Sequence, residues 1–144
     1  MLDKVNDVKK TLLEGGYTCV IQTANQLHTS RERGVKPLLT FLHSGENFQG
    51  AVGADKTVGA GAAYLYVLLG VKALWVNVIS ESALEILKNN EIAVYYERCV
   101  PYIINRKGDG VCPIEEAVSC AQTAQQAYAC IVKKLAQLQD GNAQ

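Results

Sequence analysis

The chain has 144 residues, of which 49% are hydrophobic and 19% are charged. Its 14 basic and 14 acidic residues give a formal net charge of zero, so no global field attracts nucleic acid or an anionic membrane surface. At this length roughly two-thirds of the unfolded chain's surface can be buried, so one domain can fold without a disulfide or a metal. We expect a single domain over residues 1–138, a frayed tail over 139–144, and neither a nucleic-acid nor a membrane partner.

The N-terminal segment, MLDKVNDVKKTLLEGG, carries charges where a secretory signal needs an apolar core. The apolar stretch 57–80 is divided by Lys72, and its helical half is shorter than the roughly 20 residues that cross a bilayer. The five cysteines include no C-x-x-C pair, and an odd number does not suggest a disulfide framework. We therefore expect a cytoplasmic protein with reduced thiols.

Helix and strand patterns alternate in the first half of the chain. Asp3 can cap a first helix that Gly15-Gly16 ends, and β-prone runs at 17–23 and 26–30 predict a hairpin. A short helix over 35–42 and a loop or short edge strand up to residue 53 are expected next. Asp55 is then a suitable cap for a helix over 56–69, which is apolar on nearly every side and so is predicted to be the most buried helix.

The second half begins with a predicted central strand over 73–79 and a helix over 83–89, capped by Ser80 or Ser82. Strands over 92–96 and 100–104 follow, and we expect them to be antiparallel because about four connecting residues are too few for a parallel crossover. Thr123 and Gln126 have the spacing of a capping box, which predicts that the C-terminal helical stripe breaks near 121–123.

This order of elements, with one short helix inserted after the hairpin, resembles that of the cytidine deaminase-like fold, which implies an α/β protein built as a three-layer α/β/α sandwich around a mixed sheet of about five strands. Six segments are more specific: GGYTCV, TSRERGVKPLL, ADKTVG, LGVKALWVNVISESALE, VPYIINR and GVCPIEEAV. They resemble an uncharacterised bacterial family of domains of unknown function that is grouped structurally with the cytidine deaminases. The resemblance covers about residues 9–120, and it implies the fold and a shared pocket location without an established reaction.

The predicted helix starts differ from those of true deaminases, in which a His or Cys with a Glu two residues on opens one buried helix and P-C-x-x-C opens the next, holding zinc. Here the corresponding segments read ADKT at 54–57 and SESA at 80–83, with neither His nor Cys. The two histidines, His28 and His43, fall on a hairpin strand and a peripheral helix. We therefore expect no metal and no other cofactor, and zinc-dependent deamination is the least favoured function.

Asp55 and Lys56 are the first candidate catalytic residues. A helix start offers N–H groups and partial positive charge to an anion, to which Lys56 would add a full charge. Gly59 and Gly61 would let a ligand or a neighbouring backbone approach closely. In the alternative reading Asp55 only caps the helix, Lys56 is solvated and the glycines serve helix packing.

Cys112 is the third candidate catalytic residue. It precedes Pro113, and Glu115 follows three residues later as in a capping box. A thiol at a helix start can have a lowered pKa, although Glu115 and Glu116 oppose that effect. Because no His is predicted nearby as a general base, Cys112 is either an incomplete nucleophile or a structural or ligand-lining thiol.

Candidate ligand-binding residues also lie in two polar segments. Arg31 and Arg33 follow the hairpin, and Asn105 and Arg106 open a glycine-rich loop before Cys112. Arginine forks recognise phosphate and carboxylate groups, although solvated loop charges are an equally simple interpretation.

Together these residues predict a zinc-independent protein with a small-molecule pocket, either an enzyme or a sensor, for a nucleotide-like or other anionic metabolite. The predicted lining is Asp55, Lys56, Ser80, Glu81 and Cys112. Two alternatives stay open: a ligand-binding module without turnover, and a homodimer formed through the C-terminal helix or a sheet edge.

Overall fold

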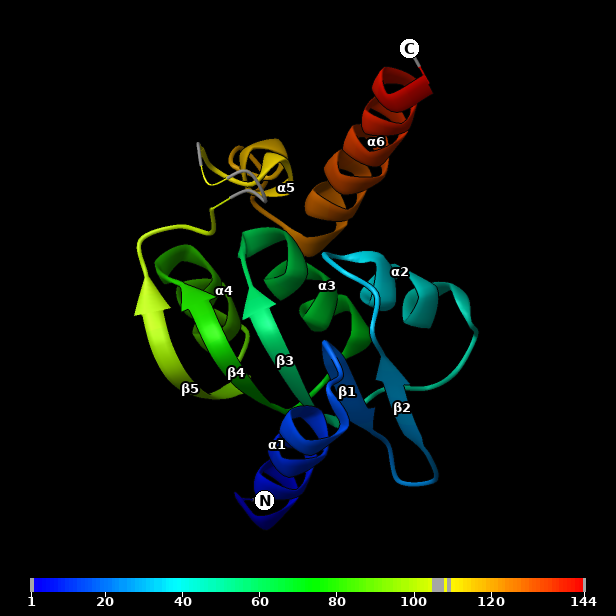
Figure 1. Ribbon diagram of the computed structural model, residues 1–144, viewed down its shortest axis with the longest axis vertical. Coiled ribbons are helices and arrows are strands. Elements are labelled where there is room, and N and C mark those ends of the chain that lie inside the picture. Colours follow the sequence, from blue (N-terminus) through cyan, green and yellow to red (C-terminus); the bar gives the residue numbers. More distant parts are fainter. Residues whose placement is uncertain (1, 105–107, 109, 144) are drawn as a thin grey trace.

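A mixed five-stranded sheet forms the centre of the molecule, with helices on both of its faces (Figure 1). The computed structural model describes residues 2–104, 108 and 110–143. The elements in chain order are α1 (Leu2–Gly15), β1 (Cys19–Gln22), β2 (Leu27–Ser30), α2 (Lys36–His43), β3 (Val52–Val58), α3 (Ala60–Leu69), β4 (Ala73–Ser80), α4 (Glu81–Asn89), β5 (Ala93–Val100), α5 (Pro113–Ala117) and α6 (Ala124–Ala143).

The strand order is β2-β1-β3-β4-β5. The β1–β2 hairpin pairs antiparallel with β3, whereas β3, β4 and β5 are parallel to one another. The predicted α/β class and mixed sheet are confirmed. Helices α3 and α4 are the crossovers between the parallel strands, as parallel pairing requires.

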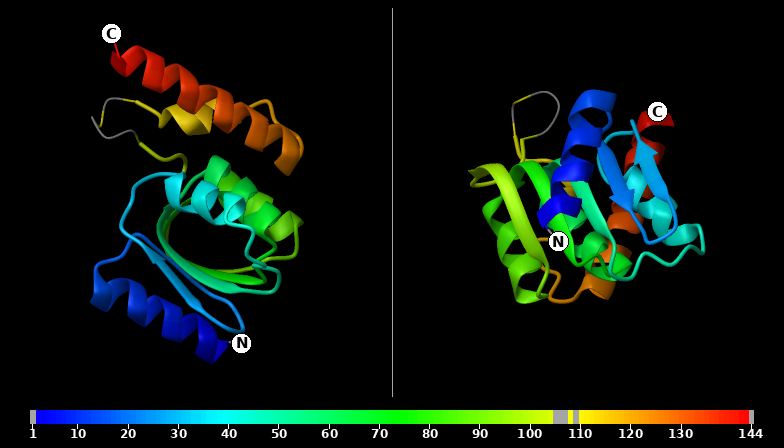
Figure 2. Two further views of the ribbon diagram at one scale, coloured as in Figure 1. Left: turned by 90° about the vertical axis from the view of Figure 1, so that its right-hand side faces the viewer. Right: turned by 90° about the horizontal axis from the view of Figure 1, so that it is seen from below.

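The two faces of the sheet are covered differently (Figure 2). Helix α1 lies on one face and buries Val5, Val8 and Leu12 against residues that include Trp75. Helices α2, α3 and α4 cover the other face, and α5 and α6 pack against α3. Among the described residues, none of the helices combines the length and apolar character that a membrane span requires.

The segment around Asp55 is a central strand, so the prediction of a helix over 56–69 is wrong in its first turn. Residues 52–58 pair with β1 on one side and β4 on the other, and helix α3 begins only at Ala60, after Gly59. Strand pairing on both sides satisfies the backbone of this segment more completely than one helical turn would. The loop expected before Gly53 is present up to residue 51, and of that segment only Val52 and Gly53 belong to β3.

Strand β5 runs unbroken from Ala93 to Val100 in parallel with β4, so the two short antiparallel strands predicted here are wrong. Pairing along the whole of β4 carries the strand through the charged Glu97-Arg98 pair, and Pro101 follows its end. Beyond it, Ile104 forms only an isolated antiparallel bridge with Val111.

The alternation of side-chain directions slips by one residue in β3 and β4. Val76 and Ile79 both belong to the core beneath α3 and α4, although strict alternation would place residues three apart on opposite faces. The intervening residues are half-buried in β4, and in β3 the corresponding Lys56 and Thr57 are exposed. Lys56 therefore lies on the open surface of the sheet.

The C-terminal segment forms two helices that meet near the predicted break. Thr123 Oγ1 accepts a hydrogen bond from the backbone N–H of Gln126 at 3.1 Å, directly before α6. The capping residue inferred from the sequence is thus confirmed. Helix α6 projects beyond the sheet and continues to Ala143, past the boundary expected after residue 138 (Figure 1).

Candidate functional site

Asp55, Tyr66 and Cys19 form a buried polar cluster between the sheet and α3. The Tyr66 hydroxyl donates to Asp55 Oδ2 at 2.6 Å, and its oxygen lies 3.3 Å from Cys19 Sγ. The backbone N–H of Thr57 donates to Asp55 Oδ1 at 3.2 Å. Because Cys19 and Asp55 are paired across β1 and β3, the sheet register itself brings these side chains together.

Burial controls the acidity of this cluster. It raises the pKa of Asp55 from 3.8 to about 7, against the opposing hydrogen bonds from Tyr66 and Thr57. Burial, reinforced by the neighbouring Asp55, also raises the pKa of Cys19 and that of Tyr66 well above their ordinary values. Cys19 is therefore a neutral thiol at neutral pH, which does not suit a nucleophile.

A cavity of about 570 Å³ lies between α3, α4 and the segment that follows β5; we name it the α4–α5 cavity. Its inner wall comes from the first turns of α3, at Ala60 and Tyr64, and from α4, including Ser82, Glu85 and Asn89. These helices start where the parallel strands end, which is the edge of an open α/β sheet at which ligands bind.

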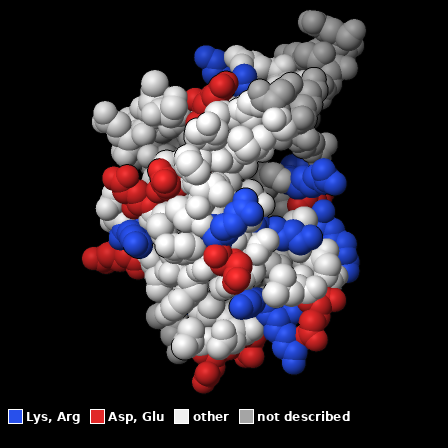
Figure 3. All heavy atoms as spheres, turned by 60° about the vertical axis from the view of Figure 1, so that its left-hand side comes forward, with Lys and Arg blue, Asp and Glu red and all other residues white. Residues whose placement is uncertain are grey.

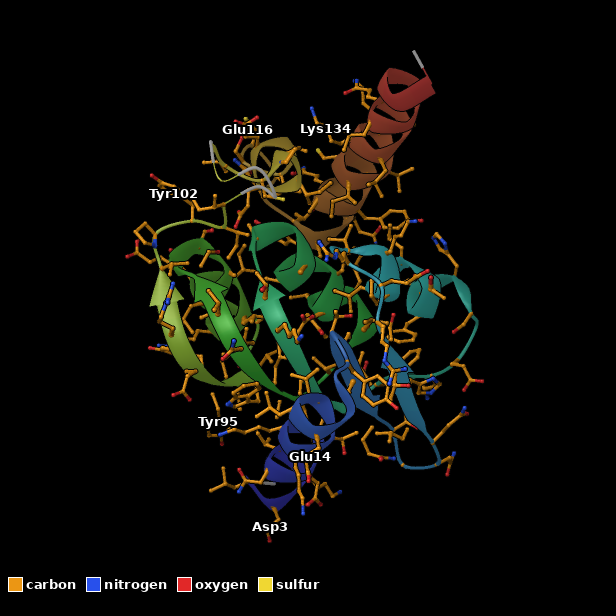
Figure 4. The ribbon with its side chains drawn as sticks, in the orientation of Figure 1. Asp3, Glu14, Tyr95, Tyr102, Glu116 and Lys134 are labelled. Carbon is orange, nitrogen blue, oxygen red and sulfur yellow. The ribbon has the colours of Figure 1, made fainter. Side chains whose placement is uncertain are left out.

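The outer wall of the α4–α5 cavity comes from Tyr102, Val111 and the α5 region, including Glu115, Glu116 and Ser119. Tyr102 and Glu116 lie at the same end of the molecule, beyond the ends of the strands, whereas Tyr95 lies toward the other end (Figure 4). Acidic and basic side chains lie interspersed on the surface turned forward in Figure 3. The domain as a whole is neutral, but this cavity is lined by carboxylates.

Glu115 is held against the start of α3. A Cβ atom built on Gly59 would lie within 3 Å of the Glu115 carboxylate, and one built on Gly61 would lie 2.5 Å from Ile114 Cγ2. The two glycines therefore let α5 pack closely on α3. This agrees with the alternative interpretation of the sequence, in which the glycines serve helix packing. Glu115 Oε1 is buried and has no hydrogen-bond partner among the described residues.

Asp55 and Lys56 do not form a helix-start site. Asp55 is 8% exposed and faces α3 from the middle of a strand, whereas the exposed Lys56 side chain follows it on the open sheet surface. Arg31 donates from Nη2 to the Gly15 carbonyl at 2.9 Å, and its guanidinium lies 4.3 Å from the centre of the Tyr17 ring. This arginine thus anchors the end of α1.

The remaining predicted residues are dispersed. Ser80 is fully buried and caps α4 by accepting from the Ala83 N–H at 3.2 Å, as the sequence indicated. Glu81 is exposed beside a smaller cavity of about 270 Å³, and Arg33 is exposed. Asn105 and Arg106 lie outside the described residues.

Cys112 precedes the first residue of α5, so the predicted helix start at Pro113 is confirmed. Its side chain makes no capping hydrogen bond, and its N–H donates to the Ile103 carbonyl at 2.9 Å. Glu115 lies against Gly59, so the expected capping box does not form. Cys112 is half-buried and is not among the residues that line the α4–α5 cavity.

Four residues of the buried cluster and the cavity were not predicted from the sequence: Tyr64, Tyr66, Glu85 and Tyr102. A tyrosine inside an otherwise apolar helix is a signal for a buried hydroxyl partner, and Tyr66 carried that signal. Glu85 gave none, because an exposed glutamate on an amphipathic helix is ordinary.

The residues present do not fit a zinc ion. Helices α3 and α4 begin after Gly59 and Ser80, and neither start has a His or Cys. Within the described ranges, no three His, Cys, Asp or Glu side chains converge as a metal-binding group. His28 and His43 lie on β2 and α2, where the sequence predicted them.

Comparisons with known proteins identify the family. Residues 7–135 match the family model described as TM1506, a domain of unknown function (DUF1893). A solved structure of a DUF1893 family protein (TM1506) from Thermotoga maritima is 20% identical, with a TM-score of 0.84 over 92% of this chain and 90% of that chain. At this identity the likeness shows the fold alone, and the curated proteins give no match. Because the family model spans most of the sequence, the chain belongs to the DUF1893 family.

Proposed function

We propose that this domain binds a small organic molecule in the α4–α5 cavity, without zinc and without turnover. The observation that carries the proposal is the cavity itself, whose volume of about 570 Å³ lies within the usual range for small-molecule sites. Its lining combines apolar side chains with a few polar groups, which is the composition that fixes a ligand's orientation.

The proposal retains the cytidine deaminase-like grouping. The order helix, hairpin, then helices alternating with strands supports it, as does the mixed five-stranded sheet. In that grouping the pocket adjoins the starts of the two helices that follow central strands, and Ala60 of α3 and Ser82 of α4 line the cavity here. The absence of His and Cys from these two helix starts supports a zinc-independent role.

Binding is favoured over catalysis by the polar groups of the lining. The Ser82 hydroxyl lies 3.2 Å from that of Ser80, and the Ser119 hydroxyl donates to the Glu116 carbonyl at 2.8 Å. Neither serine is paired with a histidine or another general base among the described residues, as nucleophilic catalysis would require. The proposed cellular location is the cytoplasm, whose reducing conditions suit the five free cysteines.

The test is ligand-induced thermal stabilisation with a panel of AMP, cytidine, spermidine and 2-phenylethylamine. A compound that binds only the folded state raises the melting temperature by an amount that grows with the ratio of its free concentration to its Kd. We expect at least one compound to do so in the wild type and in Thr40→Trp, whose exposed site on α2 lies outside the cavity. Ser82→Trp, at an exposed position in the lining, is expected to remove the shift. Equal shifts in both variants would place the binding site elsewhere.

Self-association is the second candidate function, favoured by exposed apolar side chains. Val132 on α6 is 43% exposed, and Tyr95 and Tyr96 are exposed on the edge strand β5. Sedimentation equilibrium over a range of concentrations tests it. A mass that rises from 15.6 kDa toward twice that value would support a homodimer.

A further inference from the structure

We infer that the α4–α5 cavity selects an organic cation, namely an amine or guanidine carried on a small apolar body. This inference rests on the proposed function and assigns the charge class of the ligand. It replaces the anionic metabolite predicted from the sequence, because Lys56, Arg31 and Arg33, the described cationic residues behind that prediction, do not line the cavity.

Carboxylates lie on both walls of the cavity. Glu85 comes from α4, and Glu115 and Glu116 come from α5; no described Lys or Arg lines the cavity. Within the described part of the chain the single ion pair joins Lys10 and Glu14, so the three glutamates have no basic partner there. A cation between the walls would be attracted from both sides, whereas an anion would be repelled.

Glu115 gives this attraction an anchor. Its Oε1 atom is buried beside Gly59 without a hydrogen-bond partner among the described residues. A buried acceptor that lacks a donor is unfavourable, and a bond between a charged donor and a carboxylate is roughly twice as strong as a neutral one. Because Glu115 also lines the cavity, an ammonium or guanidinium group there would be attracted to a carboxylate that no described basic residue neutralises.

Aromatic and aliphatic side chains complete the cavity. The Tyr64 hydroxyl donates to the Ala121 carbonyl at 3.1 Å, which leaves its ring to contact a ligand, and Tyr102 lines the other wall. A tyrosine ring face attracts cations. Ile86, Val111 and Val118 offer contacts for an apolar body.

The arrangement favours an organic cation over a metal ion. The three glutamates do not gather, among the described residues, into a group that could hold a metal. Carboxylates that are spread around a cavity of about 570 Å³ match a cation with a body of several atoms.

A matched ligand series tests the inference. The probes are 2-phenylethylamine, 2-phenylethanol and phenylacetate, which share one apolar body and carry a positive, zero and negative charge. In titrations followed by ¹H–¹⁵N NMR, we expect the amine to bind at least about tenfold more tightly than the alcohol, and phenylacetate to bind most weakly. Raising the salt from about 50 mM to about 500 mM is expected to weaken binding of the amine alone.

Two variants identify the anchoring carboxylates. Glu115→Gln is expected to weaken amine binding about tenfold and to leave alcohol binding unchanged, since it removes charge and keeps shape. Glu85→Gln, at an exposed site that tolerates substitution, is expected to weaken amine binding about threefold. The control is Glu46→Gln, an exposed glutamate outside the cavity, which is expected to bind as the wild type does.

The outcomes separate this inference from the proposed function. If the alcohol and phenylacetate bind as tightly as the amine, and Ser82→Trp removes all three, the charge class is wrong and the cavity is still the site. If Ser82→Trp leaves all three unchanged, the proposed function fails as well. No amine binding at roughly 20 mM would also overturn the inference. Tight binding only after Arg106→Gln and Lys107→Gln would overturn it too, since the chain would then supply the cation.

Discussion

Carboxylate and tyrosine side chains occur together at two places in this domain, with opposite surroundings. In the Asp55–Tyr66–Cys19 cluster they are buried, and their polar atoms bind one another. In the α4–α5 cavity the Glu85 and Glu116 side chains are exposed, and no described basic residue pairs with them. The first arrangement ties β1, β3 and α3 together, whereas the second leaves its hydrogen-bonding capacity for another molecule. The same side-chain types thus pair with one another in one place and are left without a described partner in the other, where we propose that they bind a ligand.

The largest expected effect is the pH dependence of the buried cluster. The pKa of Asp55 is about 7 in the folded protein and has the ordinary value of 3.8 in the unfolded chain. Between pH 3.8 and about pH 7 the folded protein therefore holds a proton that the unfolded chain releases. The contribution of Asp55 to stability is therefore full below about pH 4 and is lost as the pH rises through about 7. A shift of about three units corresponds to about 4 kcal/mol.

Urea unfolding of the wild type and Asp55→Asn at several pH values measures this effect. The wild-type free energy of unfolding, relative to the variant's, is expected to fall as the pH rises from 4 to 8. A difference that rises with pH would mean that the folded protein lowers the pKa of this carboxyl, contrary to the effect of its burial.

Tyr66→Phe tests the hydrogen bonding within the cluster. Removing the hydroxyl leaves the buried Asp55 carboxylate with a backbone donor only, and we expect a loss of about 3 kcal/mol at pH 8 and a smaller loss at pH 5. Tyr64→Phe on the same helix is the matched control, because its half-buried hydroxyl serves a carbonyl; its expected loss is about 1 kcal/mol. If both variants lost the same free energy of unfolding, the hydrogen bond from Tyr66 to Asp55 would contribute no more to stability than the one from Tyr64.

Gly61→Ala probes how tightly α5 closes the cavity against α3. The added Cβ would meet Ile114 Cγ2 at 2.5 Å, so the Ile114 side chain or α5 must shift, and the gain in helix propensity offsets part of the strain. We expect a net loss of about 1 kcal/mol together with faster amide exchange in α5. In an Ile114→Ala background, Gly61→Ala is expected to leave the free energy of unfolding unchanged. If it still lowered the free energy of unfolding by about 1 kcal/mol there, the contact with Ile114 would not be the cause of the loss.

The smallest expected effect lies in the cavity. Glu85→Gln and Glu116→Gln change exposed side chains that have no ion pair among the described residues, so the free energy of unfolding is expected to stay within about 0.5 kcal/mol of the wild type. Chemical denaturation at pH 7 measures it. A loss above 1 kcal/mol for either variant would make these glutamates structural and weaken the contrast with the buried cluster.

Local signals were sufficient for most helices and for the hairpin. The caps at Ser80 and Thr123 and the helix start at Pro113 are short-range features, because each concerns hydrogen bonds or backbone angles within a few residues. The apolar face of α1 was equally readable from its periodicity. These elements would look the same in many folds, so they identify the class of the protein without locating its site.

The segment from Val52 to Val58 shows the limit of such signals. Asp55 followed by a charged residue and an apolar run has the local pattern of a helix start, but the chain there lies between two strands that come from distant parts of the sequence. Pairing with those strands outweighs a weak local preference. Because the predicted lining assumed that Asp55 begins a helix, the predicted site does not form once Asp55 lies in the middle of a strand.

The sequence by itself determined the α/β class, the order of most elements and the lack of zinc ligands at the two helix starts, since residue types and local spacing suffice for these. Tertiary structure alone decided which carboxylates are buried and which line a cavity. Asp55 meets Tyr66 through sheet register and helix packing, and Glu115 faces Glu85 across a cavity bounded by separate helices. No local sequence pattern predicts these side-chain arrangements, because they depend on how elements that are far apart along the chain are placed relative to one another.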